Sequence, residues 1–90
     1  MDRTTETAVI AVVATGDKFA TLSSGAQKVY LVSDADCFIE FDQPAMASRS
    51  FLIKANQHPA EFEFSGGNVN KVHAITATGT ANLYILAVRT

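Results

Sequence analysis

Two histidines and one cysteine are the side chains of this sequence best suited to catalysis. His58 lies in a Gln-His-Pro segment, whereas His73 alternates with Lys71 and Ile75 in a run typical of a strand. No fixed spacing brings the two imidazoles together, so we interpret one as a surface residue and the other as a sheet-face residue. Cys37 has apolar neighbours and lacks the cationic surroundings that activate a thiol. The sequence therefore predicts a buried, unreactive thiol and no enzyme active site.

One cluster of acidic side chains is a candidate metal site, and it comprises Asp34, Asp36, Glu40 and Asp42. Carboxylates that lie close together can bind Ca²⁺, but this spacing lacks the glycine and the final glutamate of an EF-hand loop. A turn followed by a solvent-facing strand explains the same residues. The segment Ser65-Gly66-Gly67-Asn68 lacks the lysine and the helix of a phosphate-binding loop, so we interpret it as a turn. We therefore expect neither a metal nor a cofactor.

The composition favours a folded chain that associates with protein rather than with nucleic acid or membrane. Hydrophobic residues make up 48% of the chain, which argues against disorder. Charged residues make up only 18%, a low fraction for a small monomer. A net charge of −2 provides no basic surface for phosphate groups. Asp2 and Glu6 flank the N-terminal apolar run, unlike the basic start of a signal peptide. No run reaches the roughly 18 apolar residues of a membrane-spanning helix.

Strand signals dominate, because β-branched and aromatic residues form short runs separated by Gly, Ser, Asn, Asp and Pro. The expected strands are Thr7–Ala14, Lys18–Leu22, Val29–Ser33, Cys37–Asp42, Phe51–Lys54, Glu61–Phe64, Val69–Ala77 and Thr80–Val88. No helical segment of crossover length separates them, which excludes a parallel sheet. About eight short strands in residues 1–90 predict a single all-β domain, either an antiparallel β-sandwich or a jelly-roll-like barrel.

The last two runs predict a hairpin closed by the three-residue loop Ala77-Thr78-Gly79, in which only the glycine takes a positive φ. One face of the final strand then carries Ala81, Leu83 and Ile85, and the opposite face carries Asn82, Tyr84, Leu86 and Val88. Both faces are therefore candidates for burial. Exposing a Leu or Val side chain forgoes roughly 1.5 to 3 kcal/mol, so we expect the second face to be covered.

Two coverings remain open for this second face. Either the chain itself curls over it, with the N-terminal strand as the cover, or another subunit packs on it. The second alternative predicts an interface made of Val9, Ile10, Val12, Val13, Phe38, Tyr84, Leu86 and Val88. Tyr84 suits such a place, because it combines a large apolar body with a polar tip.

Part of the chain resembles small β-sandwich virion proteins of tailed bacteriophages. The resemblance is carried by the segments Val29–Ser33, Cys37–Asp42, Phe51–Ala55, Phe62–Phe64 and Lys71–Ile85. It implies a non-enzymatic structural protein of the capsid decoration, cement or head-fibre type. Such a protein would be made in the host cytoplasm, reside in the virion, form homo-oligomers such as trimers, and contact the major capsid protein or another virion protein. Residues 1–26 depart from the pattern and are expected to form part of the domain, an N-terminal arm or an exchanged strand.

A small binding module is the alternative function. In that case a loop or an edge strand around Phe38 and Tyr84 would hold a glycan or a peptide. This alternative predicts a stable monomer with one exposed aromatic patch.

Overall fold

The computed structural model describes residues 4–47, 49–56, 58–64 and 69–89, and within them the chain is all β. The strands are β1 (Thr4–Val13), β2 (Lys18–Ala26), β3 (Lys28–Ser33), β4 (Cys37–Phe41), β5 (Phe51–Ile53), β6 (Ala60–Glu63), β7 (Val69–Ile75) and β8 (Thr80–Arg89). Each of the eight expected runs overlaps one of these strands, although several bounds differ by one to four residues, because β-branched and aromatic residues fit a pleated, half-buried surface. The described residues contain no helix long and apolar enough to cross a membrane.

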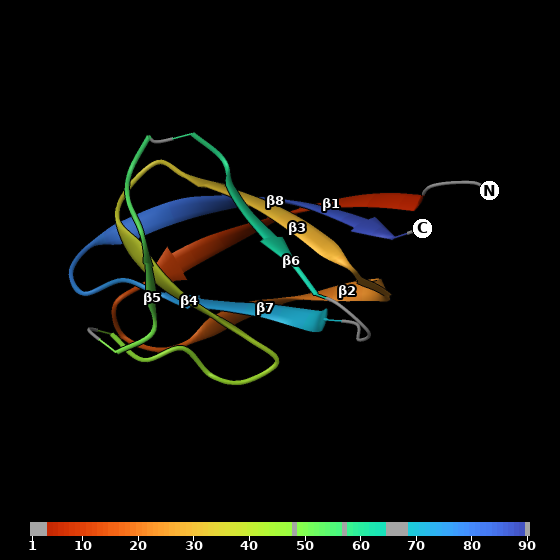
Figure 1. Cartoon of the computed structure of the whole chain (residues 1–90). Helices are drawn as coiled ribbons and strands as arrows, with labels where there is room; N and C mark the ends of the chain where they lie inside the picture. The colour runs from red at the N-terminus through yellow and green to blue at the C-terminus, as the bar shows by residue number, and fades with distance from the viewer. Residues whose placement is uncertain (1–3, 48, 57, 65–68, 90) are drawn as a thin grey trace.

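Two antiparallel four-stranded sheets pack face to face as a β-sandwich (Figure 1). Sheet A has the order β1-β8-β3-β6, and sheet B has the order β2-β7-β4-β5. The pairs β1–β8, β2–β7, β3–β6 and β4–β5 are those of one long hairpin folded at its middle. Rolling up that hairpin adds the contacts β3–β8 and β4–β7, which is the jelly-roll arrangement.

The core lies between the two sheets and follows the period-two alternation of their strands. Its fully buried side chains include Val12, Val29, Leu31 and Leu83 from sheet A and Leu22, Cys37, Ile39 and Val72 from sheet B. Residues 1–26 were expected to be part of the domain, an arm or an exchanged strand; the described residues 4–26 contain β1 and β2 of this sandwich, and residues 1–3 lie outside the described residues. Thr4 pairs with Arg89, so the two described ends of the chain lie side by side (Figure 1).

The prediction that the last two strands form a hairpin is wrong. Strand β7 belongs to sheet B and β8 to sheet A, so the turn between them crosses from one sheet to the other. In this arrangement the inner face of each strand packs against the opposite sheet, which buries apolar area that a lone hairpin would expose. The loop chemistry itself is as expected, because Gly79 has a φ of +74°. The Thr76 hydroxyl donates to the Gly79 carbonyl at 2.7 Å and steadies the turn.

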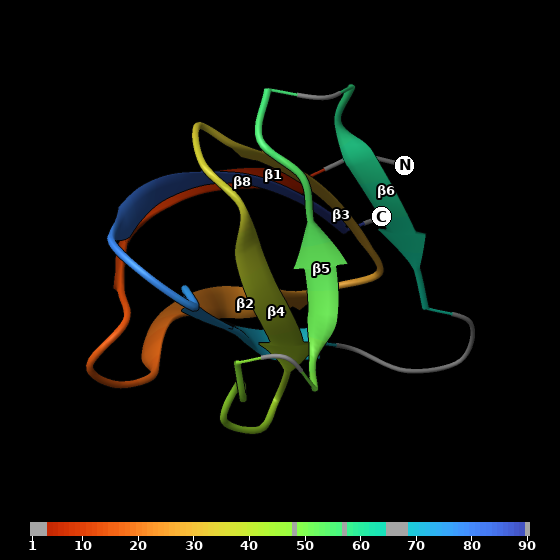
Figure 2. The ribbon, with the colours of Figure 1, turned by 90° about the vertical axis from the view of Figure 1, so that its left-hand side faces the viewer.

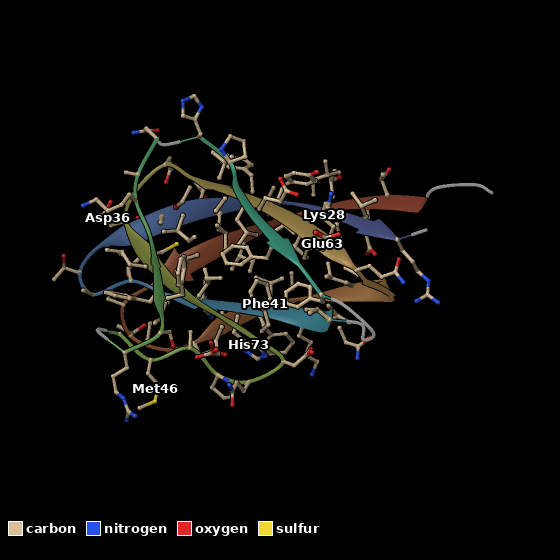
Figure 3. All side chains as sticks on the ribbon, viewed as in Figure 1. Lys28, Asp36, Phe41, Met46, Glu63 and His73 are labelled. Atoms are coloured by element: carbon tan, nitrogen blue, oxygen red, sulfur yellow. The ribbon has the colours of Figure 1, made fainter. Side chains whose placement is uncertain are left out.

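A cluster of phenylalanines closes the flank where β5 and β6, the edge strands of the two sheets, lie near each other (Figure 2). The ring of Phe41 packs edge-on against Phe62 and Phe64, with centroid distances of 5.2 and 5.0 Å. Phe51 in turn packs on Phe62 at 5.4 Å. Figure 3 shows Phe41 between the two layers. These aromatic contacts join β4 and β5 of sheet B to β6 of sheet A across this flank.

Candidate functional site

The outer face of sheet A carries several large apolar side chains that are exposed, among them Val9, Tyr84 and Leu86. Along β8, Ala81, Leu83, Ile85 and Ala87 are buried, whereas Asn82, Tyr84 and Leu86 are exposed. The predicted division of β8 into two faces is therefore confirmed. The second face stays in solvent within this single chain, with Tyr84 48% and Leu86 38% exposed.

Neighbouring strands extend this surface in two rows. Tyr84 pairs with Val9 of β1 on one side and with Val32 of β3 on the other. Leu86 pairs in the same way with Thr7 and Tyr30. The rows enclose an open apolar groove of about 460 Å³. We define the outer apolar face by the groove-lining residues Val9, Tyr30, Val32, Pro59, Tyr84 and Leu86.

A polar pair stands at the rim of the outer apolar face. Lys28 Nζ lies 3.2 Å from a Glu61 carboxylate oxygen and 6.0 Å from the centroid of the Tyr30 ring. The hydrogen bond and the negative charge of Glu61 raise the pKa of Lys28 above its ordinary value. Lys28 also pairs with Glu63 across β3 and β6, and both side chains are labelled in Figure 3. An apolar centre with a charged rim is the usual composition of a protein contact surface.

The predicted interface residues divide into several groups in the structure. Val9, Tyr84 and Leu86 lie on the outer apolar face, and Val88 is partly buried on the same side of β8. Val13 is partly buried at the end of β1. Phe38 is partly buried in β4 of sheet B, away from the others.

The prediction of an interface position is wrong for two residues. Ile10 and Val12 point into the core, with exposed fractions of 4% and 0%, so they have no surface to offer to another molecule. The run from Ala8 to Val13 is apolar at every position and therefore has no alternation that separates its two faces. Pairing with β8 sets the orientation of β1, placing Val9 outside with Tyr84 and Ile10 inside with Leu83.

Tyr30 and Val32 belong to the outer apolar face but were not predicted to do so. Their strand reads Lys-Val-Tyr-Leu-Val-Ser and buries Val29, Leu31 and Ser33, which leaves the alternate positions outward. An apolar residue at every position from 29 to 32 is the same two-faced signal that identified β8. The sequence did not indicate that β3 lies beside β8.

A partly buried histidine–carboxylate pair lies at the outer side of sheet B. His73 Nδ1 is 2.7 Å from Asp17 Oδ2, and the two side chains are 9% and 21% exposed. The imidazole packs on the ring of Phe19 at 5.1 Å, and Lys71 Nζ lies 4.8 Å from the same ring. Asp17 Oδ1 accepts the N–H of Ala45 at 2.9 Å. The pair thus fastens the loop after β4 to β7 (Figure 3).

The contacts of this pair with the other described residues are with a loop amide and an aromatic ring. No hydroxyl or thiol among the described residues is bonded to His73, and the nearby Ser50 hydroxyl donates to Glu40 at 3.1 Å. His58 is exposed beside β5, in a separate shallow depression lined also by Phe51 and Lys54. The contact between Asp17 and His73 joins residues 56 positions apart, so no local spacing could have indicated it.

The clustered acids cap loops and turns in the described structure. Asp34 accepts the backbone and side-chain N–H groups of Asn82 at 2.8 and 2.9 Å. Asp36 accepts the N–H of Ala55 at 2.7 Å and lies 3.3 Å from Lys54 Nζ. These hydrogen bonds lower the pKa of both carboxyl groups below the ordinary value of 3.8.

The remaining chemical candidates have structural contacts or lie outside the described residues. Asp42 accepts the N–H groups of Asn70 and Lys71 at 2.9 and 2.8 Å. No group of three His, Cys, Asp or Glu side chains in the described ranges is placed to hold a metal ion. Residues 65–68, interpreted above as a turn, are outside the described residues. Cys37 is buried 3.6 Å from the Ser33 hydroxyl, and burial raises the pKa of its thiol.

The hydrogen bonds accepted by the Asp34 and Asp36 carboxylates indicate that the fold loses stability in acid. Because the pKa of Asp34 is lower in the folded chain than in the unfolded chain, its contribution is present above the unfolded value of about 3.8. That contribution disappears as the pH falls through the lower, folded value. We expect Asp34→Asn to lower the melting temperature at pH 7 and to flatten its decline between about pH 4 and pH 2. Melting curves followed by circular dichroism would contradict this if the variant and the wild type declined in parallel.

Comparisons with known proteins leave the chain without an assigned relative. No family model, no curated protein and no solved structure matches it.

Proposed function

We propose that this chain is a non-enzymatic structural module that joins a larger assembly through its outer apolar face. The observation that carries the proposal is the exposure of Val9, Tyr84 and Leu86 side by side around one open groove. A monomer with these residues in water would forgo several kcal/mol, out of a total stability of roughly 5 to 15 kcal/mol. A protein surface that covers the groove recovers that free energy.

The setting that we propose is the virion of a tailed bacteriophage. The support comes from the segments that resemble small virion proteins, notably Cys37–Asp42 and Lys71–Ile85. A jelly-roll sandwich is compatible with this role, since capsid proteins use the arrangement, but lectins and cupins use it too. The chain would decorate or cement the capsid through contacts with its own copies and with the major capsid protein or another virion protein.

The non-enzymatic part of the proposal is supported by how the reactive side chains are used. The thiol of Cys37 is buried, the imidazole of His73 braces a loop, and the acids cap backbone N–H groups. An active site instead requires groups that converge on a space where a substrate can sit. The groove of the outer apolar face has an almost wholly apolar lining, which suits protein contact better than bond-making chemistry.

The test compares two leucine-to-aspartate variants. Leu86 on the outer apolar face and Leu52 on β5 have nearly equal exposed fractions, 38% and 40%. Comparing the two variants therefore separates the effect of the position from the effect of replacing an exposed leucine by aspartate. We expect the wild type to be an oligomer by light scattering on a size-exclusion column. We expect Leu86→Asp to weaken association by about 30-fold or more, as for loss of a hot spot of about 2 kcal/mol. Leu52→Asp should leave the mass unchanged, and both variants should keep the circular dichroism of a β-sheet.

Two results would contradict the proposal. One is a wild type that stays monomeric at high concentration and also fails to bind a purified capsid-type particle. The other is an oligomer whose mass responds equally to Leu86→Asp and Leu52→Asp, since the effect would then not belong to the outer apolar face.

A peptide-binding module is the second candidate, because Tyr30 and Tyr84 flank the groove. Aromatic rings at the edge of an apolar groove are a common means of holding an extended peptide. The lining is poor in the hydrogen-bonding groups that a glycan requires, which favours a peptide with apolar side chains over a sugar. A monomeric wild type that binds such peptides, and loses them on Tyr84→Ala, would support this candidate over assembly.

A further inference from the structure

The four edge strands of the sandwich differ in how they are protected from pairing with another chain. Three of them carry devices known to block such pairing. Strand β2 has a register shift between Thr21 and Ala26, β5 has only 3 residues, and β6 has 4 residues and carries two outward glutamates. Strand β1, in contrast, is 10 residues long, contains no proline and carries a single charged residue, Glu6. Its register with β8 is continuous from Thr4–Arg89 to Val13–Thr80.

The free edge of β1 presents backbone groups from alternate residues. The carbonyl groups of Val88 and Asn82 accept hydrogen bonds from the N–H groups of Gln27 and Asp34, which flank β3. The backbone N–H and C=O groups of the even-numbered residues of β8 therefore point toward β3. The odd-numbered residues of β8 therefore bond to β1, through Glu6, Ala8, Ile10 and Val12. This leaves the N–H and C=O groups of Thr5, Thr7, Val9 and Ala11 directed away from β8. In agreement, the carbonyl of the odd-numbered Val13 accepts an N–H from Thr76 at 3.2 Å.

We propose that β1 pairs with β1 of a second copy of the chain, antiparallel and about a two-fold axis. No strand among the described residues bonds to this edge of sheet A. The pairing specifies how copies of a structural module associate, and in that respect it rests on the proposed function, although it uses an edge rather than the outer apolar face. The occupant of this edge is a second copy of the chain. Such an isologous contact requires a surface that complements itself.

The edge of β1 meets this requirement in one register. Placing Thr5 opposite Ala11 of the second copy, and Thr7 opposite Val9, uses the free groups of all four residues in each chain. No two charges then face each other, since Glu6 is the only charged residue of β1 and lies opposite Ile10 of the second copy. The two-fold axis passes between the two copies of Ala8, whose small side chains allow close approach.

The pairing also extends the outer apolar face without interruption. Two four-stranded sheets become one sheet in which β1 lies beside β1, and a two-fold axis perpendicular to it keeps both outer faces on the same side. Val9 then neighbours Thr7 of the second copy, so the row that holds Tyr84 continues into the row that holds Leu86. One edge contact thus doubles the apolar surface available to a larger partner.

The test uses proline, which removes a backbone donor but is tolerated where that N–H faces away from the sheet. Ala11→Pro meets this condition, since Ala11 is exposed and lies outside the groove. Thr21→Pro is the matched control, because Thr21 is also exposed on an edge strand and its N–H faces away from β7. We expect Ala11→Pro to weaken self-association by about 10-fold or more in analytical ultracentrifugation, and Thr21→Pro to leave it unchanged.

Amide exchange of the wild type provides a second readout that does not depend on a variant. The amides of Thr7 and Val9 should exchange quickly in dilute protein and become protected as the concentration rises. If these amides exchange equally fast at all concentrations, or if Ala11→Pro folds and associates like the wild type, the edge pairing is overturned. Failure of the proposed function is distinguishable, because it would appear as insensitivity to Leu86→Asp while the response to Ala11→Pro persists. The converse pattern, a response to Leu86→Asp without a response to Ala11→Pro, would support association through the outer apolar face and contradict the pairing of the β1 edges.

Discussion

Val12→Asp is expected to abolish cooperative folding, whereas Val9→Asp, three residues earlier on the same strand, should leave the fold intact. Val12 has no exposed surface, and Val9 is 59% exposed. Placing an unpaired carboxylate among the core residues costs several kcal/mol on top of the lost apolar contacts, which is comparable with the whole stability of a small domain. At Val9 the same carboxylate remains in water.

Circular dichroism and urea unfolding of the two variants would measure this difference. Val9→Asp should keep a cooperative transition within about 1 kcal/mol of the wild type. Equal destabilisation by the two substitutions would mean that the inward and outward sides of β1 are assigned incorrectly, and with them the groove and the free edge.

Phe41→Ala is expected to lower the free energy of unfolding by about 3 kcal/mol, the usual effect of removing a large aromatic side chain from a packed position. The ring touches both Phe62 and Phe64, so its loss opens the flank between β4 and β6. Phe51→Ala is the matched control, because Phe51 is 59% exposed and, among the described residues, its ring pairs with one aromatic ring, that of Phe62.

Urea titrations of both phenylalanine variants would give the two free energies. We expect Phe51→Ala to cost about 1 kcal/mol or less, the value of one edge-on aromatic contact. A loss at Phe51 as large as that at Phe41 would contradict the view that the closure of this flank is centred on Phe41.

The sequence predicts the strands of this fold well because the signal for each strand is local. Alternation in β8 separates Leu83 and Ile85 from Tyr84 and Leu86 without any knowledge of the neighbouring strands. Glycine at the tight turn likewise follows from the φ that only residue 79 adopts there. Where alternation is absent, as from Ala8 to Val13, the inward side depends on the partner strand, and Ile10 and Val12 were therefore misassigned.

The pairing of strands could not be read from the sequence, because turn residues do not determine whether a chain returns in its own sheet or crosses to the other. Strands β7 and β8 are joined by a turn typical of hairpins and nevertheless lie in different sheets. The contact of His73 with Asp17 depends on the same global arrangement. The outer apolar face was half predictable for this reason: β8 and β1 gave Tyr84, Leu86 and Val9, whereas Tyr30 and Val32 required the placement of β3 beside β8.

The pairing of Thr4 with Arg89 determines how the chain would respond to mechanical force. A pull that separates the two ends acts on the first rung of the β1–β8 ladder. The hydrogen bonds then open one after another, each resisting with only about 1 kcal/mol. A pull along β1 from a contact on its edge instead loads many rungs at once, in shear. A chain within a larger assembly would thus resist mechanical load best when neighbouring molecules contact its strand edges and no load acts on its chain ends.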